Sequence, residues 1–142
     1  MKGYDHYHWE IILGFMILLW INDTFAYITG SLTGKHLLFP EISPKKTWEG
    51  TIGGILMTII VSIVLSYIMD TLNTSHWIFI GIITAITGTL GDLTESKIKR
   101  NLDVKNSGTF LPGHGGILDR TDSMLIALPC VFIYLYMIQN II

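Results

Sequence analysis

Residues 96–122 read SKIKRNLDVKNSGTFLPGHGGILDRTD and join two long apolar segments of the chain. The segment carries five basic side chains, one histidine and three carboxylates, at Lys97, Lys99, Arg100, Lys105, Arg120, His114, Asp103, Asp119 and Asp122. Four glycines, at 108, 113, 115 and 116, lie between its two charged ends. Clustered cations, carboxylates and accessible backbone amides are the groups that hold a polyanion through a divalent metal.

The apolar segments predict a membrane protein. Of the 142 residues, 50% are hydrophobic and only 14% are charged, and the mean hydropathy is +0.52. Four stretches are long and apolar, at residues 11–33 (interrupted by Asp23), 51–69, 71–91 and 123–142. A helix needs roughly 20 apolar residues to cross a bilayer. The sequence therefore predicts an all-α, polytopic membrane protein with four transmembrane helices, forming a single membrane-embedded domain over residues 1–142.

The basic residues predict how the chain is oriented. Four spans place residues 31–49 and 92–122 on one side of the membrane, and eight of the nine lysines and arginines fall in these two loops. Cytoplasmic loops carry the excess of lysine and arginine. We therefore expect two cytoplasmic catalytic loops in an integral protein of the cell inner membrane, with the active site facing the cytoplasm.

Two features of the first half could contribute to a site. Asp23 lies within the first span, where a carboxylate is costly unless it faces a cavity or a partner. A functional role is favoured over a structural ion pair. Ser43 and Pro44 fit an N-cap and a first helical position, which would put Lys45 and Lys46 on a first helical turn that favours anions. A solvated basic loop beside lipid headgroups is an equally good interpretation of these lysines.

The carboxylates of the second loop predict a metal site. Asp92 ends the third span, and Asp119 and Asp122 lie one helical turn apart at the start of the fourth. Such carboxylates can hold one or two hard cations such as Mg²⁺, and a second ion could be monovalent. If the third helix continues, Asp92, Glu95, Ser96 and Lys99 share one face.

Basic side chains of the same loop could neutralise phosphate oxygens, at Lys99, Arg100, Lys105 and Arg120. His114 could donate a hydrogen bond to phosphate or shuttle a proton. Alternatively, His114 is a loop histidine that only hydrogen-bonds to nearby backbone, and this interpretation is equally good.

These residues resemble the signature of the phosphatidate cytidylyltransferases, also called CDP-diacylglycerol synthases. The signature runs S-x-x-K-R, then K-D, then P-x-H-G-G-x-x-D-R-x-D, and residues 96–122 match it except that Asn106 stands where the family normally has Asp. Upstream matches are D-T-F-A-Y at 23–27, G-K-H at 34–36 and S-P-K-K-T-W-E-G at 43–50. Asn106 keeps an acceptor oxygen but loses the charge.

The resemblance implies an enzyme that transfers a cytidylyl group from CTP to phosphatidic acid, giving CDP-diacylglycerol and pyrophosphate. It implies metal binding by Asp92 and Asp119, with Asp122 beside them. It implies catalytic basic residues at Lys99, Arg100, Lys105, His114 and Arg120. It implies a substrate pocket formed by Asp23, Ser43, Lys45 or Lys46, Trp48, Ser96, Gly115 and Gly116.

Family members are usually about twice this long, so the chain resembles their C-terminal half without the N-terminal spans. We expect CTP, phosphatidic acid and membrane lipids as partners, together with a homo-oligomer or a separate N-terminal half, and no nucleic acid. Alternatives are an incomplete or non-catalytic membrane scaffold and a related CTP-dependent lipid enzyme, either a polyprenol kinase or an archaeal lipid cytidylyltransferase. A transporter is the weakest alternative, because the charged groups gather at one interface.

Overall fold

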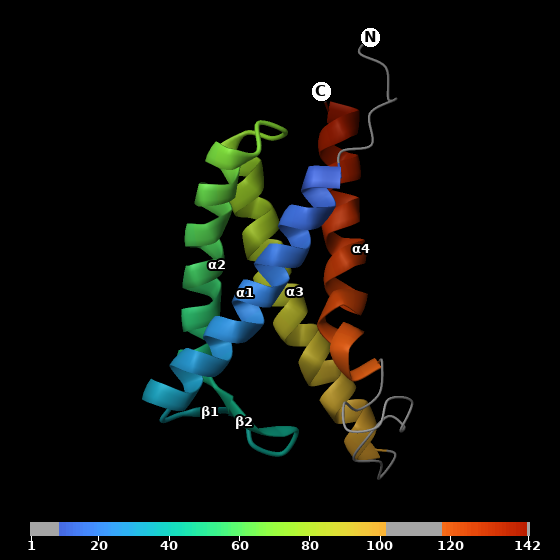
Figure 1. The fold of residues 1–142 in the computed structure, drawn as a ribbon. Helices are drawn as coiled ribbons and strands as arrows, with labels where there is room; N and C mark the ends of the chain where they lie inside the picture. The colour runs from blue at the N-terminus through green and yellow to red at the C-terminus, as the bar shows by residue number, and fades with distance from the viewer. Residues whose placement is uncertain (1–8, 102–117, 142) are drawn as a thin grey trace, which may run out of the picture.

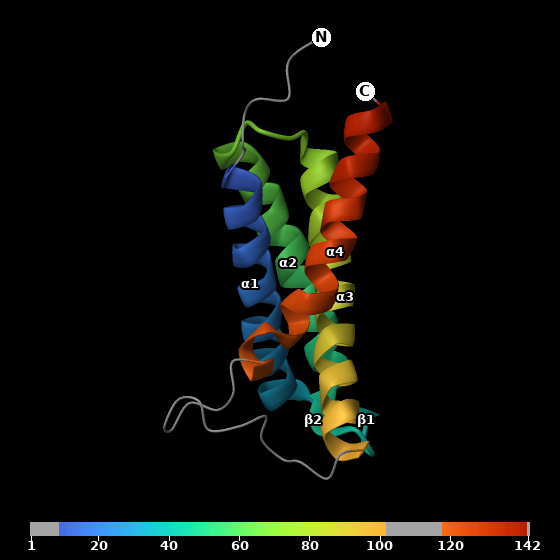
Figure 2. The ribbon, with the colours of Figure 1, turned by 90° about the vertical axis from the view of Figure 1, so that its right-hand side faces the viewer.

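The protein is a bundle of four helices with one small β-hairpin (Figures 1 and 2). The computed structural model describes residues 9–101 and 118–141, with side chains described at 9–101 and 123–138. In chain order the elements are α1 (Trp9–Thr33), β1 (Leu37–Phe39), β2 (Ser43–Thr47), α2 (Trp48–Ile68), α3 (Thr74–Asn101) and α4 (Leu118–Ile141). The predicted all-helical membrane architecture is confirmed, with the hairpin as its one addition among the described residues.

The helices alternate in direction, so the connections fall at two opposite ends of the bundle. The hairpin, the end of α3 and the start of α4 lie together at the lower end in Figure 1. This lower end is called the hairpin end below. The start of α1, the α2–α3 connection and the end of α4 lie at the upper end. The two basic loops therefore leave the bundle on the same side, as the four-span topology requires.

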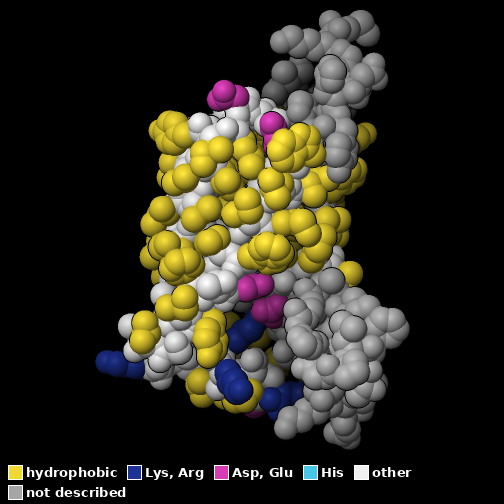
Figure 3. All heavy atoms as spheres, in the orientation of Figure 1, with side chains coloured by type: hydrophobic (Ala, Val, Ile, Leu, Met, Phe, Trp, Pro, Cys, Tyr) yellow, Lys and Arg dark blue, Asp and Glu magenta, His cyan; other side chains and the backbone are white. Residues whose placement is uncertain are grey.

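Three of the described helices, α1, α2 and α3, are long and apolar enough to cross a membrane. In α4 the apolar part, Ser123–Ile138, is shorter, and the helix continues through Pro129. Large hydrophobic side chains face outward along the bundle, among them Trp20, Leu56 and Phe132. On the face drawn in Figure 3, hydrophobic side chains form a belt across the middle and upper parts of the bundle. Such a belt matches the hydrocarbon region of a bilayer.

Large apolar side chains fill the half of the bundle away from the hairpin end. The cluster consists of Phe15, Leu18, Leu19, Leu65, Trp77, Ile80, Ala127 and Val131. Trp77 is fully buried, and its ring lies against Gly14 of α1, where an added Cβ would come within 2.3 Å of it. This core ties all four helices together and leaves the hairpin end for polar groups.

Small residues bring α2 close to its neighbours. Thr58, Ser62 and Ser66 follow one another at helical spacing on α2, and all three are buried. Thr58 donates a hydrogen bond to the Gly54 carbonyl at 2.8 Å, and Ser62 packs against Gly81 of α3. Buried hydroxyls that satisfy themselves on their own helix, next to glycines, are typical of helix packing in membranes.

The hairpin corrects one expectation. The helix predicted to begin at Ser43 and Pro44 begins instead at Trp48, with Thr47 as the N-cap. Strand β2 pairs with β1 in antiparallel fashion, with Leu37 opposite Thr47 and Phe39 opposite Ser43. Ser43 therefore does not cap a helix, and Lys45 and Lys46 lie on a strand and not on a first helical turn. Proline is tolerated in β2 because a two-stranded sheet has only edge strands.

Candidate functional site

An ion pair joins the hairpin to the third helix. Lys46 Nζ of β2 donates to Asp92 Oδ2 of α3 at 2.6 Å. Both side chains keep 26% of their surface exposed, so the pair is reachable from the hairpin end. The neighbouring Lys45 is exposed, because successive side chains of a strand point to opposite faces. Of the two lysines between which the sequence left the choice open, the structure brings Lys46 to the acidic group.

Asp23 of α1 lies beside this pair. Its carboxylate is close enough to Asp92 for mutual repulsion and to Lys46 for attraction. Side chains of Asn22 and Ser123 lie within hydrogen-bonding reach of it. Asp23 is exposed, whereas Asn22 and Ser123 are buried. Four elements, α1, β2, α3 and α4, therefore meet at one polar cluster made of Asp23, Lys46, Asp92, Asn22 and Ser123.

The cluster's charges are unbalanced. Two carboxylates repel each other across a space where Lys46 is the one cation that the described contacts supply. Figure 3 shows acidic side chains directly below the hydrophobic belt on one face, with lysine and arginine side chains beneath them. Like charges brought together near the edge of a membrane favour binding of a further cation.

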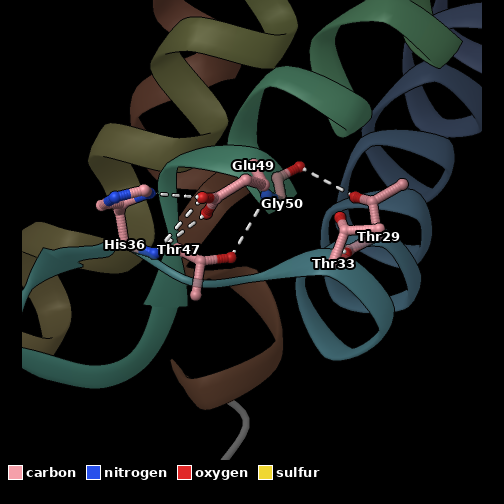
Figure 4. A network of polar contacts seen from close by, with 6 residues as sticks. All are labelled: Thr29, Thr33, His36, Thr47, Glu49 and Gly50. Carbon is pink, nitrogen blue, oxygen red and sulfur yellow. Dashed lines mark hydrogen bonds and ion pairs between the residues drawn. The ribbon is translucent and has the colours of Figure 1, made fainter.

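A second set of contacts holds the hairpin against α2 (Figure 4). Glu49 accepts hydrogen bonds from the backbone N–H of His36 at 3.3 Å, and its Oε1 lies 2.7 Å from His36 Nδ1. Behind it, the Thr47 hydroxyl accepts from the Gly50 N–H at 3.2 Å, which satisfies one free amide of the first turn of α2. These contacts hold β2 in the position from which Lys46 contacts Asp92.

We predict that Glu49→Ala loosens the hairpin. The variant loses every contact between the carboxylate and His36, so the segment around Lys35 and Lys45 opens more often. Trypsin cleavage at these lysines in the detergent-solubilised chain should be about fivefold faster, because cleavage follows the open population. Glu41→Ala removes an exposed acid from the hairpin turn and should leave the rate unchanged. Equal rates for Glu49→Ala and the parent chain would contradict the role of this contact.

The remaining described site residues lie at the hairpin end, and two of them have contacts of their own. Lys99 pairs with Glu95 one turn away at 2.8 Å, and Arg100 Nε donates to the Ile42 carbonyl at 2.5 Å. Asp92, Glu95, Ser96 and Lys99 share one face of α3, as the helical spacing predicts, because α3 continues beyond Asp92 to Asn101. The expectation that Asp92 ends its helix is wrong. Ser96 is partly buried, and Trp48 at the start of α2 is 53% exposed.

Several predicted residues lie outside the described part of the chain. This applies to Lys105, His114, Gly115 and Gly116. The backbone of Asp119, Arg120 and Asp122 belongs to the first turns of α4, but their side chains also lie outside it. Their assignments stay predictions. The start of α4 lies at the hairpin end (Figure 2), which is the end where Asp92 and Lys46 meet.

The carboxylates that the structure describes provide only some of the ligands that a hard cation needs. Within the described residues, no three carboxylate, histidine or cysteine side chains gather closely enough to hold a metal. Asp23 and Asp92 supply carboxylate oxygens of the kind that Mg²⁺ prefers, and Mg²⁺ commonly needs only one or two carboxylates besides water and phosphate. Two mutually repelling carboxylates with one lysine between them are compatible with such an ion.

Sequence reasoning missed two parts of this arrangement. Glu49 belongs to the motif at 43–50, and an acid in the first turn of a helix is the sequence signal that could have identified it. In the sequence, Asn22 is distinguished only as a polar residue within an apolar span. Its burial depends on glycines of two other helices, which spacing within one helix does not reveal.

An intramembrane helical bundle with a polar cluster at one end is the class of protein that these observations define. The sequence matches the model of the cytidylyltransferase family over residues 3–138. The chain therefore belongs to the cytidylyltransferase family, which confirms the resemblance carried by the two motifs.

Curated relatives are named phosphatidate cytidylyltransferase. The protein of Staphylococcus haemolyticus (strain JCSC1435) is 51% identical over 126 residues, which are 87% of this chain and 48% of the relative. That of Staphylococcus saprophyticus is 49% identical over 129 residues, covering 89% and 49%. That of Staphylococcus aureus (strain COL) is 48% identical over 126 residues, covering 87% and 48%. The chain spans about half the length of these relatives.

A solved structure supports the fold. It comes from a study of an intramembrane enzyme for archaeal membrane lipid biosynthesis, and it aligns with a TM-score of 0.60 at 19% sequence identity. The alignment covers 84% of this chain and 77% of that one. At this identity the likeness extends to the helical arrangement alone.

Proposed function

We propose that this chain transfers a cytidylyl group from CTP to phosphatidic acid, giving CDP-diacylglycerol and pyrophosphate. The observation that carries the proposal is the cluster of Asp23, Lys46 and Asp92 at the hairpin end of a cytidylyltransferase-family bundle. A lipid phosphate reaches such a cluster from the headgroup layer, and the nucleotide reaches it from the water. Both substrates can therefore meet where the hydrophobic belt ends.

The reaction exchanges one phosphoryl bond for another. A phosphate oxygen of phosphatidic acid forms a bond to the α-phosphorus of CTP, and the bond from that phosphorus to the bridging oxygen of the β-phosphate breaks. Pyrophosphate leaves with the electron pair. Because the attacking oxygen is already an anion, no strong general base is needed. The residues act mainly by positioning the phosphates and balancing their charge.

Each described residue has a role in this scheme. Lys46 neutralises phosphate oxygens, and its present partner Asp92 holds it at the site until substrate arrives. Lys45, Lys99 and Arg100 add positive potential at the hairpin end, which raises the local concentration of CTP. Ser43, Trp48 and Ser96 border the same end, and we assign them to the substrate pocket together with Gly115 and Gly116.

We further propose that Asp23 and Asp92, together with Asp119 and Asp122, hold one or two Mg²⁺ ions. When bound, Mg²⁺ would neutralise developing charge on the phosphates. Lys105, His114 and Arg120 then complete the set of groups that contact phosphate. The charge imbalance between Asp23 and Asp92 is the structural observation that supports this ion site.

We propose that the hairpin end faces the cytoplasm of the cell inner membrane. Eight of the nine lysines and arginines fall in residues 31–49 and 92–122, the two segments that connect helices at that end. This distribution is the usual one for cytoplasmic loops. We also propose that the active form is a homo-oligomer.

The test uses the purified chain in vesicles containing phosphatidic acid, with CTP labelled at either the α- or the γ-phosphate. Label from the α-phosphate should appear in the lipid, label from the γ-phosphate should appear in pyrophosphate, and EDTA should stop both. Lipid labelled from the γ-phosphate would indicate a kinase instead. No lipid labelling and no Mg²⁺-dependent CTP binding would reject the enzymatic function and favour a scaffold. The oligomeric mass, measured in the same preparation, tests the assembly.

A further inference from the structure

Asn22 is a buried amide in the middle of the bundle. It lies next to Asp23 in α1, and only 2% of its surface is exposed. Its Oδ1 has no hydrogen-bond partner among the described residues. A buried polar atom without a partner destabilises a folded chain, and an apolar residue of similar shape would avoid that cost. The burial of an amide here therefore needs another explanation.

Two glycines on other helices form the slot that holds this side chain. A Cβ at Gly54 of α2 would lie 2.9 Å from Asn22 Oδ1, which is too close for a real contact. A Cβ at Gly88 of α3 would lie 3.9 Å from Asn22 Nδ2. The amide thus has its oxygen directed at α2 and its nitrogen on the side of α3. A side chain enclosed in this way has little freedom to rotate.

The amide nitrogen is the part of Asn22 with a polar neighbour. Asn22 lies within hydrogen-bonding reach of the Asp23 carboxylate, and Ser123 of α4 approaches the same carboxylate. Asp23 is itself exposed and is repelled by Asp92. Without a fixed donor, its carboxylate would turn away from Asp92. A rigid amide beside it keeps the two carboxylates facing the same space.

We propose that Asn22 is a positioning residue, held between Gly54 and Gly88, whose amide orients the Asp23 carboxylate toward Lys46 and Asp92. Its kinetic consequence rests on the proposed function, because the orientation matters for turnover only if Asp23 belongs to the site. The orientation itself is a property of the folded chain and can be measured without substrate.

The kinetic test compares Asn22→Leu with Thr84→Val. Leucine has the branched outline of asparagine and no polar atom, but it is bulkier, so Asn22→Ala is measured alongside it. Thr84 is a matched control, since its hydroxyl is also fully buried, has no described partner and lies in α3. Asn22→Leu should lower kcat about 100-fold, as expected for a displaced group, while KM for CTP stays within about threefold. Thermal unfolding in detergent checks that each variant is folded, and Thr84→Val should keep full activity.

A purely structural role would give a different result. In that case Asn22→Leu would lose stability with kcat unchanged, or Thr84→Val would lose as much activity as Asn22→Leu. Either outcome overturns the proposal. If leucine does not fit between the glycines, Asn22→Ala gives the same comparison without a branched end, and the same loss of kcat is expected.

A spectroscopic measurement separates this proposal from the proposed function. Infrared spectra of the chain with ¹³C-labelled aspartate carboxyls, compared with those of Asp23→Asn, identify the Asp23 band. Asn22→Leu should shift this band and Thr84→Val should not. A shifted band in an inactive chain would support the positioning role and reject the enzymatic function. An unshifted band would reject the positioning role whatever the activity.

Discussion

Replacing Asp92 with asparagine is expected to lower formation of CDP-lipid about 100- to 1,000-fold, the range seen when one electrostatic contact to a transition state is lost. Asp92 is the acid that connects α3 to the hairpin, through a 2.6 Å contact with Lys46. Asparagine keeps the size of the side chain but loses its charge, so both the attraction for Lys46 and the proposed metal contact weaken.

Stability should change much less than activity. Lys46 and Asp92 are each 26% exposed, and ion pairs with this access to solvent contribute less than about 1 kcal/mol. A double-mutant cycle with Lys46→Met, followed by thermal unfolding in detergent, measures that contribution. Asp70→Asn is the matched control, because Asp70 is an exposed acid at the opposite end of the bundle, and it should retain full activity. If Asp92→Asn unfolds the chain or leaves turnover intact, the site assignment is wrong.

Replacing Gly50 with alanine is expected to destabilise the folded chain strongly. A Cβ at Gly50 would lie 2.6 Å from the Ala26 carbonyl oxygen and 3.0 Å from the Gly30 Cα, both backbone atoms of α1. Backbone cannot rotate away, so α1 and α2 must separate at the point where the hairpin begins. We expect a loss of about 3 kcal/mol, at the upper end of the range for overpacking, in SDS-induced unfolding.

Gly88→Ala provides the comparison for this effect. There the nearest atom is Leu19 Cδ1 at 3.0 Å, the end of a flexible side chain, and the other neighbours are at 3.9 Å. Alanine has a higher helix propensity than glycine by about 1 kcal/mol, which should largely offset the cost of the close contact with Leu19. If Gly50→Ala proves as stable as Gly88→Ala, the close approach of α1 and α2 is not as described.

The membrane spans could be predicted from the sequence because hydrophobic length is a property of continuous segments. Residues 51–69 and 71–91 differ from α2 and α3 mainly at their ends. The span containing Asp23 was also predictable, since one carboxylate does not break an otherwise apolar helix. The end of α3 was not predictable in this way, because the apolar run stops at Gly91 whereas the helix continues to Asn101.

The hairpin was not predictable by the same means. A proline after a serine is a good helix start by local rules, yet Ser43 pairs with Phe39 across a turn. Strand β1 has only three residues, too few to show an alternating pattern. The strand pair is held by residues outside β1 and β2, through contacts of Glu49 with His36 and of Arg100 with Ile42.

Sequence reasoning brings candidate residues to one end of the bundle, but it does not give their contacts. The sequence placed Lys46 and Asp92 at the same membrane face and left the choice between Lys45 and Lys46 open. Only the strand geometry selects Lys46. The roles predicted for His114 and Asp119 lie outside the described residues and stay predictions.

The central claim is that carboxylates of separate helices share a cation at the hairpin end. The most direct measurement is an anomalous difference map from crystals of the chain grown with Mn²⁺ and CTP. The account predicts a peak about 2 Å from a carboxylate oxygen of Asp92, with Asp119 or Asp23 as a second ligand and Lys46 moved from Asp92 to a phosphate. A map in which Mn²⁺ binds elsewhere, while Lys46 stays on Asp92 with the nucleotide bound, would contradict it.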